Sequence, residues 1–461
     1  MSSKLIFYTV MILIGGTTSC KVIKPYQPPS EQLNGLYRDV NTSDTTSIAD
    51  FHYEDIFTDT ILQNLIREGI QKSLNLQIAY TRIQQAQAYF EQSRLAFYPS
   101  LNASLSATSA RVTNSQINNR ISSAQQYQVG LSTSWEADIW GRLRSTKRAN
   151  LAALLQSEAA ARAVQTDLVG NIANYYYSLL ALDRELAITQ MTVQNWISTV
   201  NIMKALKEAA IVTGAAVVQS EASRYAAEVT IPDIKQNIRE TENALSILLA
   251  RNPGPVERSR LEDQHPVSLL QTGVPALLLS NRPDVQAAEY NYRYTFELTN
   301  VARTYFYPSL TITASGGLAA LNISNLFTPG ALIGSITGGL TQPIFSQGAN
   351  RARLKAAQAQ QNEALFTFRN TLLTAGQEVS NFLSSYQTAL EKTNARDSQL
   401  VNLQKSVEYT QELVRYSSAN YTEVITAQQS LLAAQLNQVG DRLQQLQAIV
   451  NLYRALGGGW K

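Results

Sequence analysis

The sequence predicts a mixed α and β fold built from two copies of one unit, in which a helix, a strand hairpin and a very long helix follow one another. Three observations support this prediction. A five-residue motif occurs twice, runs of alternating polar and apolar residues follow each copy, and long segments with coiled-coil spacing come after those runs. A change of side-chain period from two to about 3.5 marks a change from strand to packed helix.

The N-terminus has the features of an export signal. Lys4 precedes a largely apolar run of about ten residues, 5–14, and small residues follow it up to Cys20, the only cysteine of the chain. Such a run is too short to span a bilayer but fits the apolar core of a secretory signal. We expect Cys20 to be the acylated first residue of a mature lipoprotein. Thr17 stands where lipoprotein signals usually have Leu, so an ordinary signal peptide is the alternative.

The chain contains an internal duplication. The motif Phe-Tyr-Pro-Ser-Leu at 97–101 recurs at 306–310, and a second pattern around Ser223 recurs around Ser430 in the same order. Two ordered matches at nearly the same offset are the signature of a repeated structural unit.

Two segments predict unusually long helices. From Arg142 to Val212 there is no proline, and apolar residues recur at alternating steps of four and three. The same spacing extends from Leu365 to Val414. It is typical of coiled-coil packing, and about 70 residues would span about 105 Å at 1.5 Å per residue. Breaks at 213–215 and 417–420 predict that each long helix turns into an antiparallel return helix.

Four segments predict strands with one apolar and one small-polar face: 101–108, 127–135, 310–315 and 334–341. This pattern suits a sheet with lipid on one face and water on the other. The connections 111–126 and 320–331 are expected to be loops. Four strands cannot close a membrane barrel, and open edges are forbidden in lipid, so two or three copies would share eight or twelve strands. An eight-stranded barrel is filled by side chains, so a conducting pore favours twelve.

Composition excludes several classes of function. The chain has 38 basic and 35 acidic residues, so nothing in its charge points to nucleic acid. One cysteine and two histidines, His52 and His265, leave too few ligands for a zinc site or a disulfide framework. No Ser-His-Asp order or phosphate loop is present. We expect no catalytic residues, no metal and no cofactor.

Two stretches resemble the TolC-like outer-membrane efflux channels, specifically their NodT-type lipoprotein branch. The first contains Gly273-Val274-Pro275, Leu278-Leu279, Arg282-Pro283-Asp284-Val285 and Ala288-Glu289. The second is the C-terminal Leu-Tyr-Arg-Ala-Leu-Gly-Gly-Gly-Trp at 452–460. The resemblance implies a homotrimer that shares a 12-stranded transmembrane β-barrel and a long periplasmic α-helical coiled-coil barrel. It also implies two partners, a periplasmic adaptor protein and an inner-membrane resistance-nodulation-division transporter.

The resemblance divides the chain into functional segments. These are a signal peptide (1–19), a lipidated tether and equatorial segment (20–58), efflux-channel repeat 1 (59–256), an equatorial linker (257–274) and efflux-channel repeat 2 (275–461). The implied function is a passive exit duct for small toxic compounds across the periplasm and outer membrane. The alternatives are a channel for one-step protein secretion and a periplasmic coiled-coil lipoprotein without a channel.

The resemblance also implies a periplasmic gate where the hairpin tips converge. The matching candidates are Thr213, Gly214, Glu221, Arg415, Tyr416, Tyr421, Thr422, Glu423 and Thr426. Arg282, Pro283 and Asp284 are expected to start and anchor a helix, because Pro is favourable in the first helical turn and Asp there suits the helix dipole.

Overall fold

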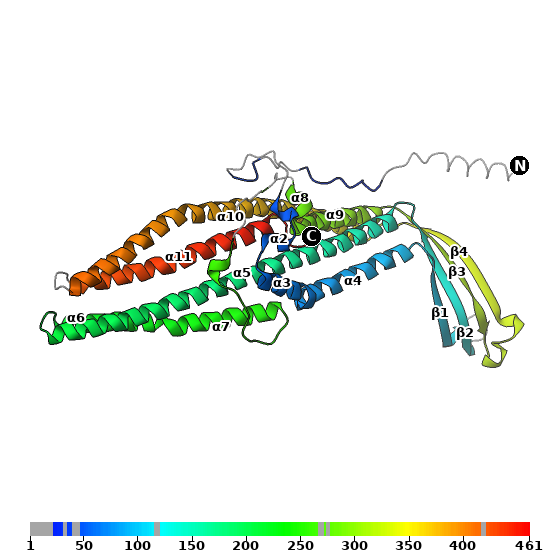
Figure 1. Cartoon of the computed structure of the whole chain (residues 1–461). Coiled ribbons are helices and arrows are strands. Elements are labelled where there is room, and N and C mark those ends of the chain that lie inside the picture. The colour runs from blue at the N-terminus through cyan, green and yellow to red at the C-terminus, as the bar shows by residue number, and fades with distance from the viewer. Residues whose placement is uncertain are drawn as a thin grey trace. The chain divides into compact units, whose positions relative to one another are not determined.

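The computed structural model describes residues 22–30, 35–38, 47–114, 120–265, 272, 277–415 and 421–461. The expected signal peptide, Cys20, the Gly273-Val274-Pro275 string and the gate candidate Tyr416 lie outside these residues. The described part is mostly helical with antiparallel strands, which confirms the mixed α and β class (Figure 1).

The described residues form two compact units, and each unit draws on both predicted repeats. Unit 1 falls within 1–30, 83–157 and 288–368, and unit 2 within 31–82, 158–287 and 369–461. Four helices have residues in both units: α4 (Leu74–Leu95), α5 (Arg142–Glu208), α9 (Pro283–Thr304) and α10 (Ala349–Arg415).

Unit 1 contains a four-stranded antiparallel sheet in the order β1-β2-β3-β4. Its strands are β1 (Ser100–Asn114), β2 (Arg120–Ala137), β3 (Ser309–Ala320) and β4 (Leu332–Thr341). The expectation of a loop over 111–126 is wrong, because pairing continues from Arg111 opposite Ser123 to Asn114 opposite Arg120. Strands pair through hydrogen bonds between their backbones, so two segments can pair even where polar and apolar side chains do not alternate. The second connection lies within the predicted loop and contains two short 3-10 helices, η3 (Ile323–Asn325) and η4 (Pro329–Ala331).

The two long helices agree with prediction. α5 and α10 contain 67 residues each, which corresponds to about 100 Å at 1.5 Å per residue. In the second repeat the return helix α11 (Tyr421–Ala455) is continuous. In the first it is divided into α6 (Gly214–Glu228) and α7 (Thr230–Leu248). Pro232 explains the division, because it lacks an N–H and its ring clashes with the carbonyl four residues earlier, at Glu228.

Shorter elements complete unit 2. They are η1 (Ile48–Asp50), α2 (Tyr53–Ile56), α3 (Thr60–Lys72), η2 (Leu261–Asp263) and α8 (Leu277–Asn281). Among the largest fully buried side chains of this unit are Trp196 and Tyr176, both on α5. In the described part of the chain, no helix is both long and apolar enough to cross a membrane.

The turn after α5 begins earlier than the predicted break at 213–215. Ala210 adopts a left-handed conformation with φ of 59°. Its N–H donates to the Lys207 carbonyl at 3.0 Å, and the Ile211 N–H donates to the Leu206 carbonyl at 2.9 Å. These two bonds form a Schellman motif, in which the left-handed position is usually glycine. Gly214, the glycine within the predicted break, instead begins α6.

Replacing Ala210 with Gly is therefore expected to stabilise the protein by about 1 kcal/mol, because a Cβ is unfavourable in the left-handed region. The measurement is the unfolding midpoint of the purified protein in detergent. Ala205→Gly in the exposed last turn of α5 is the matched control and should destabilise by about 1 kcal/mol. A lower midpoint for Ala210→Gly would contradict this account of the turn.

Candidate functional site

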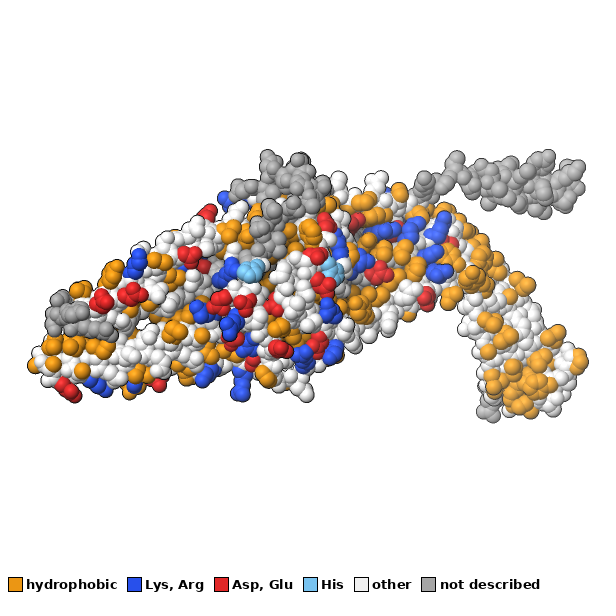
Figure 2. Space-filling view, in the orientation of Figure 1, with side chains coloured by type: hydrophobic (Ala, Val, Ile, Leu, Met, Phe, Trp, Pro, Cys, Tyr) orange, Lys and Arg blue, Asp and Glu red, His pale blue; other side chains and the backbone are white. Residues whose placement is uncertain are grey.

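The sheet has one continuous apolar face. Opposed residues in an antiparallel pair point to the same side, and Leu105, Val129, Leu318 and Leu332 form one row across all four strands. Leu105, Leu332 and Ile336 are largely exposed. Figure 2 shows hydrophobic side chains over the strands, whereas the Lys and Arg side chains visible there lie over the helices. Exposed apolar surface of this extent marks a membrane or protein contact.

The opposite face of the sheet is polar. One row across the four strands consists of Ser100, Ser134, Thr313 and Thr337, and another of Asn102, Ser132, Ser315 and Ser335. Within the described residues β1 pairs only with β2, and β4 pairs only with β3. The sheet therefore combines an apolar face, a polar face and two unpaired edges.

Aromatic residues gather where the strands join the helices. The Trp135 Nε1 donates a hydrogen bond to the Phe97 carbonyl at 2.9 Å, and the Trp140 Nε1 donates to the Pro308 carbonyl at 2.8 Å. The Trp140 and Tyr307 rings lie 4.9 Å apart. In each copy of the Phe-Tyr-Pro-Ser-Leu motif, a backbone carbonyl thus accepts a hydrogen bond from a tryptophan indole. Trp and Tyr are enriched at membrane–water boundaries, so this end of the sheet has the composition of such a boundary.

The hairpin tips of the two repeats pack against each other in unit 2. Met203 of α5, Ala216 and Val217 of α6, Val414 of α10 and Val424 of α11 form one buried cluster. A polar contact reinforces it, because the buried Gln428 Nε2 donates to the Thr199 Oγ1 at 2.9 Å. We call Met203, Ala216, Val217, Val414 and Val424 the tip cluster.

The predicted gate residues surround the tip cluster in different environments. Tyr421 packs against it, whereas Thr213, Gly214, Thr422, Glu423 and Thr426 are exposed. Glu221 of α6 pairs with Lys204 of α5 at 2.8 Å, and this hydrogen bond is the main cause that lowers the pKa of the Glu221 carboxyl. Arg415 is the last residue of α10. Of the candidates whose side chains the structure describes, only Tyr421 packs against the tip cluster.

The Arg-Pro-Asp motif lies at the start of α9. Pro283 is the first residue of this helix, and Arg282 before it is 7% exposed. The Arg282 guanidinium donates to Asp284 Oδ2 and to Glu378 Oε2, each at 2.6 Å, and to the Ala455 carbonyl at 3.0 Å. Burial alone would lower the pKa of Arg282, but Asp284 and Glu378 together raise it above its ordinary value.

The C-terminal glycines lie against the same motif. Gly457 has φ of 91°, and a Cβ there would lie 2.3 Å from the Asn281 carbonyl oxygen. The Trp460 Nε1 donates to that carbonyl at 3.0 Å. The residues next to the Arg-Pro-Asp motif and the C-terminal glycines therefore form one junction, in which only glycine fits at position 457.

Sequence reasoning missed two polar residues, Glu378 in this junction and Asn300 in unit 1. Glu378, the second carboxylate on Arg282, stands on a heptad-patterned helix and resembles any exposed helical glutamate. Asn300 is fully buried on α9, where its Oδ1 accepts from the Lys24 N–H at 3.0 Å and its Nδ2 donates to the Lys24 carbonyl at 2.9 Å. The sequence carries no distinct signal for Asn300, because polar residues such as Glu297 and Thr299 surround it on the same helix.

A family model described as "Outer membrane efflux protein" matches residues 65–251 and 274–458. The solvent efflux pump outer membrane protein SrpC of Pseudomonas putida is 27% identical over 460 residues, 98% of this chain and 97% of its own length. The probable outer membrane lipoprotein SilC of Salmonella typhimurium is 27% identical over 457 residues, again 98% and 97%. The solved structure of the outer-membrane channel OprN covers 96% of this chain and 100% of its own with a TM-score of 0.88; at 22% identity this likeness shows the fold.

Proposed function

Because this chain belongs to the outer membrane efflux protein family, we propose that it is the outer-membrane duct of a tripartite efflux pump that exports small toxic compounds. It works passively, with energy supplied by an inner-membrane transporter of the resistance-nodulation-division class. A periplasmic adaptor protein joins the two. The long helices support this role, because about 100 Å of helix suits a conduit that spans the periplasm.

The observation that carries the proposal is the two-faced sheet with unpaired edges. Lipid accepts its apolar face, and the row Ser100, Ser134, Thr313 and Thr337 suits a water-filled interior. Unpaired edges are not tolerated in lipid, so neighbouring copies must supply partners for β1 and β4. Three copies give twelve strands, and their interior is wider than the filled interior of an eight-stranded barrel. We therefore propose a homotrimer that shares a 12-stranded transmembrane barrel and continues as a helical coiled-coil barrel.

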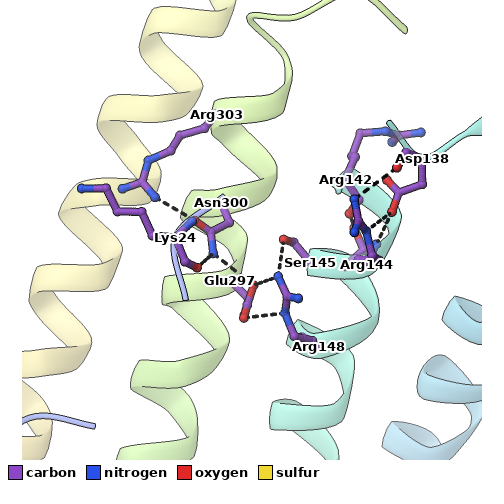
Figure 3. A network of polar contacts seen from close by, with 10 residues as sticks. Lys24, Asp138, Arg142, Arg144, Ser145, Arg148, Glu297, Asn300 and Arg303 are labelled. Atoms are coloured by element: carbon purple, nitrogen blue, oxygen red, sulfur yellow. Dashed lines mark hydrogen bonds and ion pairs between the residues drawn. The ribbon is translucent and has the colours of Figure 1, made fainter. Parts of the chain in front are cut away.

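We further propose that Cys20 carries the lipid anchor and that the following residues form a docked tether. Figure 3 shows Lys24 beside Asn300 on α9. The two hydrogen bonds between the Lys24 backbone and the Asn300 side-chain amide fix the position of the tether along α9. The relative SilC, a probable outer membrane lipoprotein, supports this anchor. Arg282, Pro283 and Asp284 act as the structural anchor of the second repeat and take no part in transport.

The proposal is tested by deleting the gene and measuring growth on organic solvents, antibiotics and metal salts. Increased sensitivity to at least one class, reversed by the wild-type gene, is the expected result. Unchanged growth across the panel, together with unchanged accumulation of a fluorescent dye, would count against an efflux role. The compounds to which the deletion strain becomes sensitive also identify the class of compound that the duct exports.

The closed end of the duct is proposed to lie at the hairpin tips around the tip cluster. Glu423 in the first turn of α11 and Arg415 at the end of α10 supply polar contacts between neighbouring hairpins. Replacing both with Gln should weaken the closed state and let large antibiotics leak inward. A lower inhibitory concentration of vancomycin is the expected readout.

Lys405→Gln with Glu408→Gln is the matched control, since both residues are exposed on the same helix α10 but about two turns before its end. This control removes one positive and one negative charge, as the tip variant does. It should leave vancomycin sensitivity unchanged. Equal sensitivity of both double variants would exclude Glu423 and Arg415 as gate contacts.

A further inference from the structure

Positive charge is concentrated in unit 1, which contains the sheet. The described residues of this unit include 13 Lys and Arg but only 6 Asp and Glu, whereas the whole chain is nearly balanced at 38 and 35. Most of the excess lies on the helix ends next to the strands, at the same end as Trp135 and Trp140. A basic zone beside an aromatic boundary is suited to the phosphates of membrane lipids.

A cavity of about 1000 Å³ opens within this zone between α4 and α5. The charged residues that line it are Glu91, Arg94, Arg144, Lys147, Arg148 and Arg293. Five cations and one carboxylate therefore face one space. Leu95 and Tyr98 also line it and are 66% and 70% exposed, so the cavity has an apolar margin on the side of the strands.

Two of these cations are already neutralised. Arg144 pairs with Asp138 at 3.0 Å, and Arg148 pairs with the buried Glu297 at 2.8 Å (Figure 3). These ion pairs hold two guanidinium groups in place at the wall of the cavity. They do not remove the charge of the other three cations.

The other three cations form no ion pair with the described residues. Among the described residues, neither Arg94 nor Lys147 has an ion pair or a side-chain hydrogen bond, and both side chains are exposed. The Nε of Arg293 is buried without a hydrogen-bond partner. The Arg293 guanidinium lies over the Tyr26 ring, 5.5 Å from its centroid. Glu91 accepts a hydrogen bond from Gln87 at 2.7 Å, so one carboxylate faces three cations that have no carboxylate partner among the described residues. A buried donor without a partner is unfavourable unless a ligand or water supplies the acceptor.

We propose that this cavity binds the phosphate group of an anionic phospholipid from the leaflet at the helical end of the sheet. Arg94, Lys147 and Arg293 contact the phosphate oxygens, while Leu95 and Tyr98 contact the glycerol and the first part of the acyl chains. Arg is well suited to phosphate because its fork of N–H groups matches two oxygens. The inference rests on the proposed function, which places the sheet in the membrane. It adds a lipid site to that function.

The test uses the purified full-length protein in neutral detergent and isothermal titration with short-chain phosphatidylglycerol, phosphatidylcholine and inorganic phosphate. Arg94→Gln with Lys147→Gln is the variant. Arg351→Gln with Lys355→Gln is the matched control, because these two exposed cations of unit 1 do not line the cavity. Wild type should bind phosphatidylglycerol in preference to phosphatidylcholine. The variant should bind it about tenfold more weakly or worse, and the control should match wild type.

Equal weakening in the variant and the control, or none in the variant, would overturn the site. If inorganic phosphate binds as tightly as phosphatidylglycerol and displaces it, the cavity takes soluble phosphate and the lipid assignment is wrong. Conductance of the variant in planar bilayers separates this inference from the proposed function. The variant should conduct like wild type, and absence of conductance in wild type itself would count against the duct instead.

Discussion

Ile336→Arg should prevent stable insertion of the protein into the outer membrane. Ile336 lies near the middle of β4, is 83% exposed, and shares a row with Ala314, Thr133 and Leu101 on the apolar face. An arginine on the lipid face of a transmembrane strand costs about 2–4 kcal/mol at the centre of the bilayer. In a trimer this cost recurs in each copy. The measurement is the fraction of the expressed chain recovered as folded, heat-resistant oligomer in outer-membrane fractions.

Thr337→Arg provides the matched control, because it introduces the same side chain one residue further along the same strand. Thr337 lies on the polar face opposite Thr313, and an arginine there meets water in the proposed duct. Its insertion should be close to wild type. If both variants insert equally well, or if Thr337→Arg is the more damaging, the assignment of the two faces is wrong.

Arg282→Met should cause the largest loss of folding stability among single substitutions in unit 2. The substitution leaves Asp284 and Glu378 without their cation and the Ala455 carbonyl without a donor. Removing one partner of a fully buried ion pair costs about 3–5 kcal/mol. The loss here should lie toward the lower end of that range, because the Asp284 and Glu378 side chains are 39% and 33% exposed and water partly solvates the charges left behind. Thermal unfolding followed by far-UV circular dichroism in detergent measures the effect.

Two further variants separate a buried charge network from a general effect of losing an arginine. Arg67 pairs with Glu54 at 2.8 Å on the surface, where both side chains are largely exposed, so Arg67→Met should change stability little. The triple variant Arg282→Met, Asp284→Asn, Glu378→Gln removes the unpaired charges and should recover much of the loss. If the unfolding temperature of Arg282→Met is no lower than that of Arg67→Met, Arg282 is not a structural anchor.

Patterns within single segments predicted most of the fold. The 3.5-residue spacing identified both long helices, and alternation identified all four strands. The strands extend further than predicted, because the segment around Arg111 and Ser123 pairs through its backbone without showing alternation. The divided return helix and the early turn have local causes, Pro232 and Ala210. Ala210 in particular could not be recognised, since residues other than glycine are uncommon in the left-handed region.

The arrangement of the candidate site was less accessible from sequence. The Arg-Pro-Asp string indicated the start of a helix, but its partner Glu378 lies 96 residues away on α10. The unpaired cations Arg94 and Lys147 come from two helices separated by the whole first hairpin. No local pattern shows that these residues face one cavity. The residues of the gate stay a prediction, and the double replacement of Glu423 and Arg415 is its main test.

The central claim is that several copies of this chain share one membrane barrel and form a passive duct. Single-channel recording of the purified full-length protein in a planar bilayer tests it most directly. The claim predicts discrete conductance steps that are proportional to voltage and need no energy source, with few insertion events for Ile336→Arg and normal steps for Thr337→Arg. Protein that binds the bilayer but never conducts, or conductance that is identical for both variants and wild type, would contradict it.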